Sequence, residues 1–83
     1  MTYRIEYTNP PQAELRAMDA KTRAAFDNGI TAVARDPYGA GSKPYPGGGS
    51  DDHRITQVGG VAIITYQVSR SVLLVTVVKL VAR

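Results

Sequence analysis

His53 and the lysines and arginines are the side chains of this sequence best suited to proton transfer and to binding anions. An imidazole exchanges protons near neutral pH, so His53, the one histidine, is a candidate general acid or base. Lys79 interrupts an otherwise apolar run, and strand alternation places it on the same face as Val81 and Arg83. Lys79 and Arg83 are therefore candidates to line one cationic groove. The alternative is that Lys79 is a charge that protects an exposed strand from aggregation.

Metal chemistry has little support in the sequence. There is no cysteine, and Asp51 and Asp52 come without a third ligand at a suitable spacing. We interpret both carboxylates as caps or solvated groups at the end of a loop, and we expect no metal and no other cofactor. The net charge of +3 suits an anionic partner such as RNA, although many ordinary proteins carry a similar charge.

The N-terminal half has the pattern of one strand and two helices. Residues 3–7 alternate apolar and charged side chains, which is typical of a half-buried strand. Asn9, followed by two prolines, indicates the start of a short helix over 12–18. Asp19 can cap a second helix that stops at Asp36-Pro37. We expect the two helices to form a hairpin that packs on a sheet through one set of apolar residues: Leu15, Met18, Phe26, Ile30 and Val33.

The C-terminal half has the pattern of a loop followed by strands. Residues 38–50 include five glycines, too many for a regular element, so we predict a mobile loop. Apolar segments at 54–58, 61–68 and 72–81 are joined by turns so short that they must form an antiparallel meander. The order β-α-α-β-β-β predicts one α+β domain over residues 1–83, with the helix hairpin on a twisted antiparallel sheet of about four strands.

Size and hydropathy bear on location and partners. A domain of 83 residues buries only about 60–65% of its unfolded surface, so a partner chain would stabilise it. The last apolar run has the length of a buried strand and is too short to span a membrane. Without a signal peptide or a membrane segment, we expect a soluble cytoplasmic protein with no membrane partner.

This pattern resembles the RelE/ParE superfamily of toxins along nearly the whole chain. The opening strand, the helix hairpin, the loop ending near Lys43-Pro44, and the strand containing Tyr66-Gln67-Val68 before an apolar last strand occur in family order. The resemblance implies a toxin of a type II toxin–antitoxin system that is neutralised in a complex with a cognate antitoxin. Many RelE-like members cut mRNA in the ribosomal A site without a metal, whereas ParE-like members inhibit DNA gyrase and are not nucleases.

The resemblance also implies roles for individual residues. Arg54 falls where ribosome-dependent members carry a catalytic Lys or Arg, and would bind the phosphate and stabilise its charge; the alternative is an ordinary solvent-facing strand residue. Arg83 aligns with a C-terminal Arg that stabilises the transition state, and Lys43 matches an RNA-binding Lys or is simply a solvated loop residue. His53 and Arg54 are neighbours on a strand and point to opposite faces unless a bulge intervenes. The candidate sites are catalytic Arg54, Arg83, Lys79 and His53, and RNA-binding Lys43, Arg54 and Lys79.

The sequence also departs from the family pattern. Ile63 stands where most active members have an Arg, and no aromatic tail follows Arg83. Loss of one such cation typically lowers the rate by about a hundredfold or more. Tyr66 is expected to be mainly a core residue. The sequence therefore supports a ribosome-dependent endoribonuclease that inhibits translation, with a ParE-like or catalytically weakened binding protein and a plain interaction module as alternatives.

Overall fold

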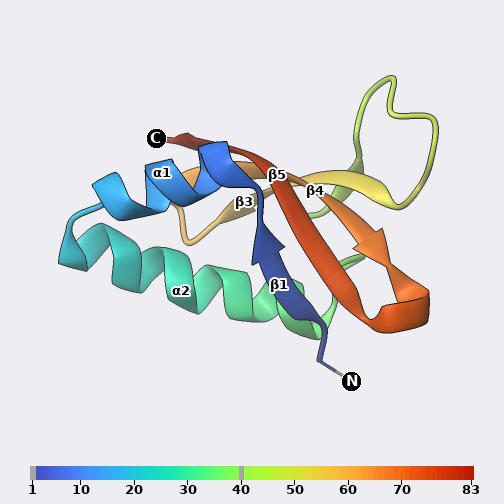
Figure 1. The fold of residues 1–83 in the computed structure, drawn as a ribbon, viewed down its shortest axis with the longest axis horizontal. Coiled ribbons are helices and arrows are strands. Elements are labelled where there is room, and N and C mark those ends of the chain that lie inside the picture. The colour runs from blue at the N-terminus through green and yellow to red at the C-terminus, as the bar shows by residue number, and fades with distance from the viewer. Residues whose placement is uncertain (1, 40) are drawn as a thin grey trace.

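The computed structural model describes residues 2–39 and 41–83, and Figure 1 shows a helix hairpin on one side of a twisted sheet. This confirms the predicted α+β class. The elements follow the predicted order, with a two-residue strand and one turn of 3-10 helix in addition. They are β1 (Arg4–Tyr7), α1 (Asn9–Ala17), α2 (Ala20–Arg35), β2 (Lys43–Pro44), β3 (His53–Val58), β4 (Ala62–Ser69), η1 (Arg70–Val72) and β5 (Leu74–Ala82).

The starts of the two helices differ in how they are capped. Asp19 caps α2 as predicted, because its side chain accepts a hydrogen bond from the Thr22 N–H at 2.7 Å. Asn9 marks the start of α1, as predicted, but the helix spans Asn9–Ala17 where 12–18 was expected, and Thr8 occupies the cap position without a side-chain cap bond. The Thr8 hydroxyl instead donates to the Val77 carbonyl at 3.3 Å, which ties the start of α1 to β5.

The sheet is larger than predicted and is mixed. Its strand order is β1-β5-β4-β3-β2, and β3, β4 and β5 form the predicted antiparallel meander. β1 runs parallel to β5, so the expected fully antiparallel sheet of about four strands is corrected to a mixed sheet of five. Parallel neighbours need a long connection, and here the helix hairpin and the intervening strands supply it. β2 forms within the predicted loop 38–50, of which residue 40 lies outside the described residues.

The core lies between the helices and one face of the sheet. Leu15, Phe26 and Val33 are buried against the sheet, and Met18 and Ile30 pack on the same cluster, as predicted. The strands contribute their inward side chains: Val58, Ala62, Ile64, Tyr66, Val68, Val75, Val77 and Leu80. Among residues 2–39 and 41–83, no helix covers the opposite sheet face, and we call it the open face (Figure 1).

Helix α2 comes unusually close to the turn between β3 and β4. A Cβ atom at Gly29 would lie 2.3 Å from the Gly59 nitrogen, and one at Gly59 would lie 2.1 Å from the Ala25 carbonyl oxygen. Gly59 also has a positive φ of 60°. Glycine at both positions lets α2 rest directly on the backbone of the turn.

Candidate functional site

Four side chains form a row across the open face. Strand register pairs Lys43 with Ile55, Ile55 with Thr65, and Thr65 with Lys79. Directly paired residues of antiparallel strands point to the same side of the sheet. Lys43 and Lys79, predicted separately as RNA-binding residues, therefore lie at the two ends of one row, and both are exposed.

A register shift in β4–β5 decides where Lys79 points. Thr65 pairs with Lys79 while the next residue, Tyr66, pairs with Val77, so Val78 is an extra residue in β5. Val77 is fully buried and Lys79 is exposed, although simple alternation would give them the same orientation. The bulge thus reverses the alternation: odd-numbered residues of β5 face the core before residue 78, as Val75 and Val77 do, and the open face after it, as Lys79 and Val81 do.

Arg83 reaches the open face beside Lys79, as predicted. Its backbone N–H donates to the Val61 carbonyl at 2.8 Å, and its guanidinium Nη1 donates to Gln57 Oε1 at 2.9 Å. Gln57 pairs with Ile63, which pairs with Val81 on β5. Ile63 therefore lies between Val81 and the glutamine that binds Arg83, and it makes this part of the face apolar.

A groove of about 190 Å³ runs over the open face between these residues. Its lining is Tyr45, Ile55, Ile63, Thr65, Lys79 and Val81. Val81 is 51% exposed, an unusual degree for a large apolar side chain in a strand. The groove lining combines the apolar side chains of Ile55, Ile63 and Val81 with the ammonium group of Lys79.

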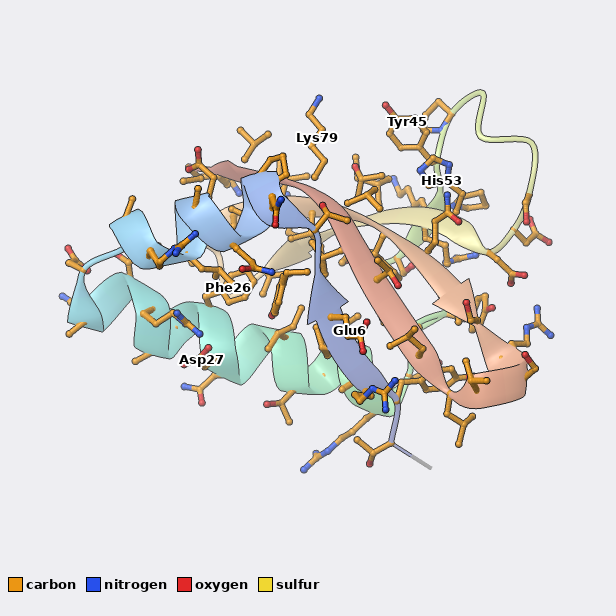
Figure 2. The ribbon with its side chains drawn as sticks, in the orientation of Figure 1. Glu6, Phe26, Asp27, Tyr45, His53 and Lys79 are labelled. Atoms are coloured by element: carbon orange, nitrogen blue, oxygen red, sulfur yellow. The ribbon has the colours of Figure 1, made fainter. Side chains whose placement is uncertain are left out.

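His53 and Tyr45 form an aromatic pair at one end of this groove. Their ring centroids are 4.6 Å apart and the rings are inclined by 17°, so they are stacked. Backbone pairing supports the stack, since the Tyr45 N–H donates to the His53 carbonyl at 2.7 Å. Figure 2 shows Tyr45, His53 and Lys79 on the side of the sheet opposite Phe26. Sequence reasoning missed Tyr45 because it was assigned to a loop, although its spacing from Lys43 is that of a shared strand face.

Arg54 points the other way, so the alternative of an ordinary solvent-facing strand residue is wrong. It is 8% exposed, and its Nε and Nη2 donate to Ser42 Oγ at 2.7 Å and to the Ser42 carbonyl at 3.2 Å. Nη1 donates to the Asp51 carbonyl at 2.9 Å. As predicted, His53 and Arg54 do not share a face, because no register shift separates them. The structure places Arg54 where it fastens both ends of the segment between Ser42 and Asp51.

Tyr66 also holds this segment, through hydrogen bonds of its hydroxyl on the helix side of the sheet. It is fully buried, as predicted for a core residue, and its hydroxyl donates to the Pro37 carbonyl at 2.6 Å and lies 2.6 Å from Ser42 Oγ. Burial raises the pKa of the Tyr66 hydroxyl, and the hydrogen bond with Ser42 and the charge of Arg54 partly offset this.

Asp52 belongs to a second anchor, formed with Tyr38 and Arg70. The Tyr38 hydroxyl donates to Asp52, and Arg70 Nε donates to the same hydroxyl at 3.0 Å. Arg54 and Arg70 both lie over the Tyr38 ring, at 5.0 and 4.8 Å from its centroid. Burial and the neighbouring Asp52 raise the pKa of Tyr38. Asp51 and Asp52 thus meet protein groups at the loop end, and no group of three metal-ligating side chains occurs among residues 2–39 and 41–83.

A larger cavity of about 260 Å³ lies on the helix side of the sheet, between α2 and β3. Its lining includes Asp36, Ser42 and Tyr66 and contains no lysine or arginine. A cavity with a carboxylate and without a cation does not suit a phosphate. The open face is therefore a better candidate for an anionic ligand than this cavity.

Comparisons with known proteins agree with the fold. No protein-family model and no curated protein sequence matches the chain. A chain in the crystal structure of the RelBE2 toxin–antitoxin complex from Mycobacterium tuberculosis is similar over 100% of both chains, with a TM-score of 0.79 and 15% identity. A chain in the archaeal RelE–RelB complex from Pyrococcus horikoshii is similar over 100% of this chain and 97% of its own, with a TM-score of 0.75 and 17% identity. The protein has the α+β fold found in RelE–RelB complexes. Within the described part of the chain, no helix has both the length and the apolar character to cross a membrane.

Proposed function

We propose that this protein is the toxin of a type II toxin–antitoxin system and that it cuts mRNA on the ribosome, using the open face. One observation carries the proposal: Lys43, Lys79 and Arg83, selected from the sequence for anion binding, lie on the open face, where Lys79 lines the groove. Similarity in fold to chains of two toxin–antitoxin complexes supports the toxin role. The proposed partners are a cognate antitoxin, the ribosome and mRNA.

The charge pattern of the open face supports RNA as the ligand. Among residues 2–39 and 41–83, the strand register brings one carboxylate to this face, Glu6, which pairs with Thr76 at the β1 side of the sheet. Glu6 forms a salt bridge with Arg4 at 3.2 Å, so its charge is partly compensated. The groove beside Lys79 is therefore free of a lining carboxylate, and Coulomb attraction favours a polyanion there.

The reaction requires little beyond these residues. The 2′-hydroxyl of RNA attacks the adjacent phosphorus, its proton passes to a base, and the bond to the 5′-oxygen breaks as that oxygen gains a proton. Lys79 and Arg83 would stabilise the charge that grows on the phosphate oxygens, and Lys43 would hold the neighbouring backbone. His53 is the candidate for proton transfer, because an imidazole exchanges protons near neutral pH.

Arg54 would serve this site indirectly. Its three nitrogens already donate to Ser42 and Asp51, and it is buried on the helix side of the sheet. We therefore propose that Arg54 positions the segment that carries Lys43 and Tyr45, in place of the direct phosphate contact implied by the resemblance.

Induced expression followed by mapping of mRNA 5′ ends tests the proposal. We expect cuts within translated messages, which Lys79→Ala reduces by about tenfold to a thousandfold, the range for losing one preorganised cation. Lys21→Ala, an exposed change on α2, is the matched control and should leave cutting unchanged. Absence of cuts by a folded wild-type protein would overturn the nuclease function.

A second candidate is a ParE-like inhibitor or another non-nuclease toxin. It is favoured by the apolar groove floor, where Ile63 occupies the position of a usual catalytic cation and Ile55 and Val81 lie beside it. Inhibited DNA supercoiling without mRNA cuts in the same expression experiment would select this candidate.

A further inference from the structure

Tyr45 and His53 form a stacked aromatic pair beside the groove. Tyr45 lines the groove, and the ring of His53 stacks against it at the end of the groove. A Cβ atom at Gly48 would lie 2.9 Å from His53 Nδ1, which shows that the turn of the β2–β3 hairpin packs closely around the imidazole. The ring of Tyr45 is thus held by His53 while it lines the groove.

We propose that Tyr45, backed by His53, is a stacking platform for one unpaired nucleobase of a single-stranded RNA. This deepens the proposed function and rests on it. Aromatic rings bind bases through stacking in many single-strand binding proteins, with the backbone held by adjacent cations. Here the platform stands next to Lys43 on one hairpin, and Lys79 lies across the groove.

The groove suits an unpaired nucleobase and its flanking phosphates in shape and in charge. A base against Tyr45 would rest on the apolar side chains of Ile55 and Ile63, with the Thr65 hydroxyl as a polar group within the same lining. Its flanking phosphates would face the ammonium groups of Lys43 and Lys79, which end the same cross-strand row.

Two roles of His53 follow from different parts of the residue. The ring as a flat surface holds Tyr45 in place, and the ring nitrogens offer proton transfer. A phenylalanine at position 53 keeps the first property and removes the second. His53→Phe should therefore retain RNA binding, whereas His53→Ala should weaken it.

The test is equilibrium binding of a short single-stranded RNA carrying the fluorescent base 2-aminopurine, whose emission is quenched by stacking. We expect quenching by the wild-type protein and by Tyr45→Phe, and weakening of binding by about tenfold to a hundredfold in Tyr45→Ala. A duplex of the same sequence should bind more weakly because its bases are not available. Thermal unfolding of each variant checks that the fold is intact, and Tyr3→Ala, at the opposite edge of the sheet, is a control for removal of an aromatic ring.

The outcomes separate the platform from the function on which it rests. If Lys79→Ala weakens binding while folded Tyr45→Ala does not, RNA binding stands and the platform is wrong. If wild type binds the single strand without quenching, the base does not stack and the platform is also wrong. If wild type neither binds RNA nor cuts mRNA in cells, both proposals fail, and the groove is a protein-binding surface.

Discussion

Arg54 stabilises the fold through the hydrogen bonds of its buried guanidinium group. Three donor nitrogens fix Ser42 and Asp51, and the guanidinium lies over Tyr38. Removing this buried charged donor takes away three part-buried hydrogen bonds, so Arg54→Ala should lower the free energy of unfolding by about 2–4 kcal/mol. Urea unfolding measures this, with Lys21→Ala as the exposed control. An unchanged unfolding midpoint in Arg54→Ala would mean that the guanidinium contacts contribute little.

Tyr66 should make stability depend on pH in the alkaline range. Burial raises its pKa above the ordinary value of 10.0, so the folded state holds the phenolic proton more tightly than the unfolded state. The stabilisation is fully present below pH 10 and is lost as pH rises through the folded pKa. Tyr66→Phe should lower stability at neutral pH by about 1–2 kcal/mol through loss of the Pro37 and Ser42 contacts and should reduce the alkaline slope.

Chemical unfolding between pH 8 and pH 11 checks this linkage. A residual slope is expected in Tyr66→Phe because the pKa values of Tyr7 and Tyr38 are also raised, in both cases mainly by burial. Tyr45→Phe, which keeps the stacked ring at the groove, is the control. Identical slopes for wild type and Tyr66→Phe would contradict the assignment.

Helix α2 and the β3–β4 turn lie in close backbone contact at Gly29 and Gly59. Alanine usually favours a helix over glycine by about 1 kcal/mol, yet a Cβ at position 29 would lie 2.3 Å from the Gly59 nitrogen. Backbone must move to relieve this overlap, so Gly29→Ala should destabilise by about 1–3 kcal/mol. Asn28→Ala, next to it on the exposed side of α2, should be neutral or slightly stabilising.

Thermal unfolding of Gly29→Ala and Asn28→Ala compares the gain in helix propensity with the cost of the close approach at position 29. A more stable Gly29→Ala would show that helix propensity outweighs the close approach. The comparison is informative because the sequence alone marks Gly29 as a weak point in a helix, whereas the structure gives it a packing role.

The fold places Lys43, Lys79 and Arg83 together on the open face. Their positive charge predicts that RNA binding weakens as the salt concentration rises. Each phosphate neutralised on a single strand contributes about 0.7 to the slope of log Kd against log salt concentration. If Lys43, Lys79 and Arg83 each meet one phosphate, the slope should be about 2, and Lys79→Ala should reduce it by about 0.7. Titration of single-stranded RNA at several salt concentrations measures both values. A slope near zero would show that the open face does not bind the RNA backbone.

The pattern of neighbouring residues in the sequence was enough to predict the α+β class of the fold and to place several candidate site residues on one strand face. Apolar periodicity located both helices, the meander and the helix residues of the core, since these depend on neighbours three or four positions apart, or on alternation. Alternation also placed Lys79, Val81 and Arg83 on one face, which the structure confirms. The roles of the site residues in catalysis stay predictions.

Only the tertiary structure decided the features that depend on contacts between distant segments. The bulge at Val78 reverses the orientation along β5, and no local pattern distinguishes Lys79 from the buried Val77 before β4 is paired. Arg54 turned inward because Ser42 and Asp51 offered acceptors across the hairpin, and Tyr45 met His53 through strand pairing. These arrangements are set by register and by burial, which one strand cannot specify without its partners.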